Sequence, residues 1–203
     1  MARSKKAAGE RKVKKVVVPK LKVNPSARMM KQGFVTPKAK KGEKVRKVRV
    51  TEKAVTDAMV QARRFVDEVS AKVYSNMGKT KTAMVQGDRN PLYNVLKEMC
   101  VSLPIDKICS SSRIATVTRK RLESGAMGAA RSTGVGLSTA RAIFSGKAKP
   151  ISGELKIQVA NLIDAYFQAL GHLASKLAVH SKRLTVQAED VSMAASLIHG
   201  HHN

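Results

Sequence analysis

Two long segments of the chain repeat apolar residues at intervals of three and four, which predicts helices that each bury one face. They are residues 51–78 and 152–180. Thr51 and Ser152 stand at their starts and are suited to cap the first free N–H groups. In the second segment the expected buried stripe is Leu155, Val159, Leu162, Tyr166, Ala169, Leu173 and Leu177. At about 1.5 Å per residue this helix would be about 43 Å long. Two short neighbours cannot cover it, so the stripe needs a partner chain or a second unit of the same kind within this one.

Shorter helices flank each long one, so that the order short, long, short occurs twice in an all-α chain. The short helices are expected over 26–33, 90–100, 137–144 and from residue 188 onward. Pro91 suits a first helical position, and Glu189 and Asp190 favour a helix start at Ala188. The connecting segments are an extended loop at 182–186, a basic helix over 112–123 and a glycine-rich joint over 124–136.

Charge narrows the class of partner. The chain carries 39 Lys and Arg against 14 Asp and Glu, a net charge of +25, and 18 of the basic residues lie in the first 50. We therefore expect residues 1–24 to be a disordered basic tail and the partner to be a polyanion. Aromatic residues make up only 3% of the chain, which disfavours stacking on single strands. Double-stranded DNA and structured RNA both remain open from charge alone.

Cellular location follows from what the sequence lacks. No apolar run approaches the ~18–20 residues of a membrane span, and no apolar signal core follows Met1. Cys100 and Cys109 are the two cysteines, which fits a reducing compartment better than a disulfide framework. We expect an intracellular protein that does not contact a membrane.

Residues 178–191, Ala-Val-His-Ser-Lys-Arg-Leu-Thr-Val-Gln-Ala-Glu-Asp-Val, closely resemble the end of the long helix, the second loop and the last helix of core histones. Among these the segment looks most like histone three, and residues 141–195 align with archaeal histones without a gap. The resemblance implies a histone fold over 137–199. It also implies a salt bridge between Arg183 and Asp190, and a contact between two dimers at His180 and Asp190.

The first half fits the same plan more loosely. Residues 25–101 supply three helices in the right order, with 34–50 as an enlarged first loop and 79–82 as the second loop. Residues 102–136 would be the linker. This arrangement resembles the histone doublets of some large DNA viruses, in which two folds in one chain pair head to tail. The alternative is a single histone fold with an unrelated helical arm, a subunit of a chromatin or transcription complex that pairs with a dissimilar partner.

The resemblance implies that the partners are double-stranded DNA, bound without sequence specificity, and other histones or doublets in an octamer-like assembly. Its location would be chromatin in the nucleus, or the virion and viral factory if the source is viral. The residues expected to face DNA are Arg28, Lys31, Lys79, Lys81, Thr82, Arg141, Lys147, Lys149, Lys182, Arg183 and Thr185.

Catalytic and cofactor motifs are weak throughout. Gly78-Lys79-Thr80 lacks the upstream glycine of a phosphate-binding loop, since Val73 occupies that position. The triple serine at 110–112 has no nearby histidine to activate it. The C-terminal histidines, His199, His201 and His202, are more typical of a solvated tail than of a metal site. We expect no enzymatic activity, no cofactor, no metal and no small-molecule substrate.

Overall fold

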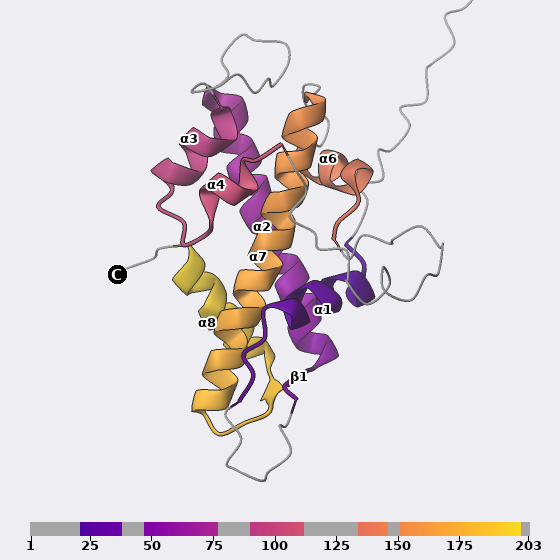
Figure 1. Cartoon of the computed structure of the whole chain (residues 1–203), viewed down its shortest axis with the longest axis vertical. Coiled ribbons are helices and arrows are strands. Elements are labelled where there is room, and N and C mark those ends of the chain that lie inside the picture. The colour runs from indigo at the N-terminus through magenta and orange to yellow at the C-terminus, as the bar shows by residue number, and fades with distance from the viewer. Residues whose placement is uncertain (1–20, 38–46, 77–89, 112–133, 146–150, 200–203) are drawn as a thin grey trace, which may run out of the picture.

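The computed structural model describes residues 21–37, 47–76, 90–111, 134–145 and 151–199. These residues are mostly helical (Figure 1). The helices are α1 Val23–Gln32, α2 Glu52–Asn76, α3 Pro91–Glu98, α4 Ile105–Ile108, α6 Leu137–Ser145, α7 Gly153–His180 and α8 Ala188–Ile198; the strands are β1 Arg49–Val50 and β2 Thr185–Val186. None of these helices has the length and apolar character needed to cross a bilayer. The expected tail at 1–24 lies almost wholly outside the described residues, and the expected helix at 112–123 lies wholly outside them.

The long helices begin at the residues that the sequence predicts. Ser152 Oγ accepts a hydrogen bond from the Leu155 amide at 3.1 Å, and Thr51 Oγ1 accepts one from the Ala54 amide at 3.2 Å. These bonds satisfy amide groups that no earlier turn can reach. Asn90 caps α3 in the same way, with Pro91 in its first turn.

Helices α2 and α7 cross at the centre of the molecule, with α7 running along its long axis (Figure 1). Phe65 of α2 stacks on Tyr166 of α7, with ring centroids 4.6 Å apart. The Tyr166 hydroxyl lies 2.9 Å from Nε2 of His199, the residue that ends α8. Burial raises the pKa of Tyr166, so this hydroxyl remains protonated. Helix α2 of the first half therefore meets α7 and the end of α8 at one aromatic cluster.

Three short helices, α1, α6 and α8, pack on the long helix of the opposite half of the chain as well as on their own. We refer to residues 21–100 as the first half and residues 134–199 as the second half. Helix α1 packs on α7, while α6 and α8 both pack on α2. The Ser70 hydroxyl of α2 donates to the Phe144 carbonyl of α6. Each half thus covers the other, and one core cluster spans both.

Burial along α7 differs from the expected stripe in its C-terminal part. Leu155, Val159, Leu162 and Tyr166 are fully buried as predicted, but Ala169, Leu173 and Leu177 are only partly buried. The fully buried positions there are Leu170, Ala174 and Ala178. The reason is that α1 crosses α7 at Gly171, and residues three, four and seven positions apart on a helix share one side. The expected stripe was wrong in this region because the sequence does not show which side of α7 the helix α1 covers.

Helix α1 and α7 approach so closely that a glycine is required. A Cβ on Gly171 would overlap the Met30 carbonyl oxygen of α1, and one on Gly33 would overlap the Gln168 carbonyl oxygen of α7. The backbones therefore meet directly at this crossing. The segment after α1 is held by a hydrogen bond from the Val35 amide to Ser175 Oγ at 3.0 Å.

We predict that Gly171→Ala lowers the free energy of unfolding by about 1–3 kcal/mol, because the added methyl group forces α1 away from α7. Gly153→Ala is the matched control, since no heavy atom lies within 4 Å of a Cβ at that helical position. It should leave stability unchanged or raise it by up to about 1 kcal/mol. Urea denaturation followed by circular dichroism measures both variants. Equal stabilities for the two would contradict the close crossing.

Candidate nucleic-acid interface

Two loops that are far apart in the sequence join at one end of the molecule, where β1 and β2 pair in parallel. Arg49 is opposite Thr185, and Val50 is opposite Val186. The Arg49 amide donates to the Leu184 carbonyl at 2.8 Å. The residues on both sides, 47–51 and 182–187, are named here the paired loops (Figure 1). Each paired loop leads directly into a helix, α2 or α8.

The paired loops expose basic side chains from both halves. Lys47 and Arg49 are exposed in the first loop, and Lys182 is exposed in the second. The start of each helix adds the positive end of the helix dipole, which favours anions. Basic side chains and helix starts together suit a phosphate backbone, with no base contact required.

Arg183 and Asp190 are brought together within the second paired loop. Arg183 Nη2 lies 2.8 Å from Asp190 Oδ1, and Asp190 Oδ2 accepts from Arg183 Nη1 at 3.1 Å and from the Gln187 amide at 2.8 Å. The hydrogen bond to Asp190 raises the pKa of Arg183, opposed by partial desolvation and reinforced by the charges of Asp190 and Glu189. The buried carboxylate therefore fixes both the loop and the start of α8.

The other residues expected to face DNA are spread over three places. Arg28 and Lys31 are exposed on α1, and Arg141 is exposed on α6, while Thr185 is half-buried in β2. Five more lie outside the described residues: Lys79, Lys81, Thr82, Lys147 and Lys149. Of the eleven, the structure places three in one cluster, namely Lys182, Arg183 and Thr185.

Sequence reasoning missed Lys47 and Arg49 as site residues. Lys47-Val48-Arg49-Val50 alternates basic and apolar residues, the period of a strand with one solvated face. The structure exposes the two basic residues and half-buries the two valines. The alternation is thus visible in the sequence, but the prediction assigns this segment to an enlarged first loop over 34–50.

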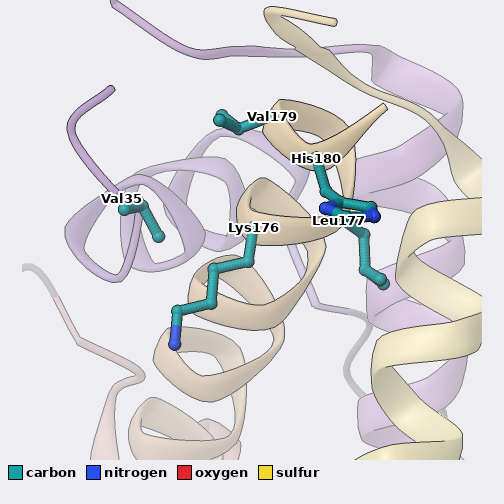
Figure 2. Close-up of a pocket in the computed structure, with 5 residues that line it drawn as sticks. All are labelled: Val35, Lys176, Leu177, Val179 and His180. Atoms are coloured by element: carbon teal, nitrogen blue, oxygen red, sulfur yellow. The ribbon is translucent and has the colours of Figure 1, made fainter. Parts of the chain in front are cut away.

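A second exposed surface lies where α7 ends and α8 packs beside it. His180 is exposed on the last turn of α7, and Met193 and Leu197 of α8 are 58% and 50% exposed. Figure 2 shows His180 stacked beside Leu177 on one flank of α7, while Val35 faces the flank that carries Lys176 and Val179. The residues labelled in Figure 2 line a shallow depression of about 470 Å³; they are Val35, Lys176, Leu177, Val179 and His180. The two exposed apolar side chains of α8 were not foreseen from the sequence.

Two kinds of reactive group can be assessed among the described residues, a cysteine thiol and clusters of metal ligands. Burial, with a smaller effect from Asp106, raises the pKa of the Cys109 thiol to about 12, so it is not a thiolate at neutral pH. No group of three His, Cys, Asp or Glu side chains within the described ranges could hold a metal ion.

Comparison with solved structures identifies the fold. The crystal structure of the histone from Methanopyrus kandleri superimposes with a TM-score of 0.59 at 19% sequence identity, and the match covers 90% of this chain and 97% of that one. No family model matches the sequence, and no curated protein is significantly similar to it. The chain therefore has a histone fold.

We predict that Asp190→Ala lowers the free energy of unfolding by about 1–3 kcal/mol, because it leaves the Gln187 amide and the Arg183 guanidinium without their shared acceptor. Glu189→Ala is the control, since Glu189 is an exposed acid in the same helical turn. Chemical denaturation of both variants gives the comparison. A loss in Glu189→Ala as large as that in Asp190→Ala would mean that the helix dipole, and not the ion pair, stabilises this end.

Proposed function

We propose that this protein is a histone-like structural protein that binds and compacts double-stranded DNA without sequence specificity. The observation that carries the proposal is the pairing of β1 with β2, which gathers exposed basic side chains from both halves at one end of a histone fold. Phosphate neutralisation with release of counterions would supply the affinity. The M. kandleri protein is named as a histone, which agrees with this assignment.

We further propose that the chain is a histone doublet, like those the sequence resembles. Two observations support this. Each half contributes a short–long–short set of helices, and α2 packs against α6, α7 and α8. The alignment to one histone chain covers 90% of the sequence, far more than the second half alone. The buried position of α7 argues against the alternative, a single histone fold that waits for a dissimilar partner chain.

DNA would curve across the paired loops, which would contact its phosphate backbone and not its bases. Lys47, Arg49 and Lys182 can each meet a phosphate, while Arg183 is oriented by Asp190. We favour double-stranded DNA over structured RNA because the positive charge suits both, whereas only DNA accounts for the histone resemblance and the histone fold. Lys79, Lys81, Thr82, Lys147 and Lys149, which lie outside the described residues, are also proposed to contact DNA.

Larger particles would form through the surface at the end of α7. His180 and Asp190 are the residues we expect at a contact between copies, and the exposed Met193 and Leu197 on α8 extend that surface with apolar area. Exposed apolar side chains next to one another commonly mark an interface. We propose that the protein forms nucleosome-like particles. These particles would lie in the chromatin of a nucleus, or in a virion and viral factory.

We predict that the double variant Arg49→Ala, Lys182→Ala weakens DNA binding to the same degree for every duplex sequence. The slope of log affinity against log salt should fall by about two, one for each lost phosphate contact. Lys97→Ala, Lys107→Ala removes the same charge from exposed residues of α3 and α4, away from the paired loops. Fluorescence anisotropy over a salt series measures both. Equal slopes for the two double variants would place the DNA elsewhere.

We predict that micrococcal nuclease digestion of DNA reconstituted with this protein leaves protected fragments of discrete length. Leu197→Glu puts a charge on the proposed contact between copies and should shorten the fragments. Leu137→Glu makes the same change at an exposed position of α6 and should preserve them. If the wild-type protein protects no fragment at any protein-to-DNA ratio, the packaging function is wrong.

A further inference from the structure

A row of polar side chains crosses the otherwise apolar middle of α7. Gln158, Asn161 and Asp164 are spaced by three residues, so they lie along one side of the helix. All three are buried, with 0%, 0% and 1% of their surface exposed. Amide and carboxyl groups are costly to bury unless each finds a hydrogen-bond partner. Each of the three side chains therefore needs a hydrogen-bond partner from another part of the chain.

Two of the partners lie in the segment that connects the two halves, and a third, Asn90, lies at the start of α3. Gln158 Nε2 donates to the Cys109 carbonyl at 2.9 Å, and its Oε1 accepts from Asn90 Nδ2 at 3.0 Å. Asn161 Nδ2 donates to the Ile108 carbonyl at 3.4 Å. Both carbonyls end α4, a helix that the sequence did not predict. We call residues 101–111 the connecting segment.

The connecting segment touches both halves at once. Helix α4 packs on α3 of the first half and on α7 of the second. The Ser102 amide donates to the Ile198 carbonyl at the end of α8, at 3.2 Å. Where the chain is described again, the Val135 amide donates to Asp164 Oδ1 at 2.8 Å. The polar row therefore holds the chain on both sides of residues 112–133.

We propose that the row formed by Gln158, Asn161 and Asp164 is a recognition surface for the chain's own connecting segment, and that it excludes a separate histone-fold chain from pairing with the second half. The inference rests on the doublet proposed above and specifies its partner. The second half selects the first half of the same molecule through hydrogen bonds that a foreign partner does not supply.

The exclusion follows from what a foreign partner would leave behind. A separate chain could cover α7 with apolar side chains, but it would have to displace α4 from between α3 and α7. Gln158 and Asn161 would then be buried without the Cys109 and Ile108 carbonyls. Because an unmatched buried polar group costs more than a matched one contributes, the foreign pair is disfavoured even when its apolar surfaces fit.

The first test measures opening of the connecting segment through Cys109, in the full chain carrying Cys100→Ser. Cys109 is half-buried at the end of α4, and a thiol with a raised pKa reacts slowly until it is released. Gln158→Met should speed alkylation by iodoacetamide at least tenfold. The control Gln168→Met makes the same change on the same helix, at a residue bonded to Gln32 and not to the connecting segment, and should leave the rate unchanged.

The second test measures partner exchange without DNA. A protease site placed within residues 112–133 is cut after folding, and isotopically labelled and unlabelled proteins are mixed. Native mass spectrometry should detect mixed pairs at least ten times more slowly for the wild type than for Gln158→Met. If Gln158→Met does not fold, Ser102→Pro removes the amide bonded to Ile198 and leaves α7 unchanged.

The proposal is overturned if the halves of the cut wild-type protein separate or exchange as fast as those of Gln158→Met. It is also overturned if Cys109 is alkylated as fast in Gln168→Met as in Gln158→Met. Neither result would bear on DNA binding, which is measured separately at the paired loops. A failure of the packaging function and a failure of self-selection are therefore distinguishable.

Discussion

The long helix α7 is buried on every side over residues 158–167, and the rest of the molecule follows from covering it. An amphipathic helix can rest on one neighbour, but a helix buried all round needs several. Helices α1, α2, α4, α6 and α8 all contact it. Because α1 and α2 come from the other half of the chain and α4 from the connecting segment, neither half has a complete core alone. Folding of each half and pairing of the two halves are therefore one process.

The covering helices also decide where charge can lie. Apolar and aromatic side chains fill the centre, as in the stack of Phe65 on Tyr166, so the basic residues are confined to helix ends, loops and outer faces. The paired loops are such an end. Their position depends on the pairing of β1 with β2 and on the buried carboxylate of Asp190. A surface suited to phosphate thus follows from the way the core is closed.

Local chemistry made much of this fold predictable from the sequence. Helix starts at Thr51, Ser152 and Pro91 depend on neighbouring residues, and the pair Arg183 and Asp190 was inferred from resemblance over a short segment. Features that depend on distant contacts were missed. Helix α4 is too short to show a period, and its partners Gln158 and Asn161 resemble ordinary polar residues when read along the sequence. The exposure of Met193 likewise depends on which helices happen to lie beside α8.

The dependence of α2 on helices near the C-terminus has a consequence for synthesis of the chain on the ribosome. Helix α2 ends at residue 76, and α8, which packs on it, begins only at residue 188. At 5–20 residues per second, roughly 6–22 seconds pass between the two. During that interval α1 and α3 can pack on α2, but the part of α2 that α8 covers still lacks its final neighbour. The nascent chain is therefore open to aggregation at that surface until its last helix emerges.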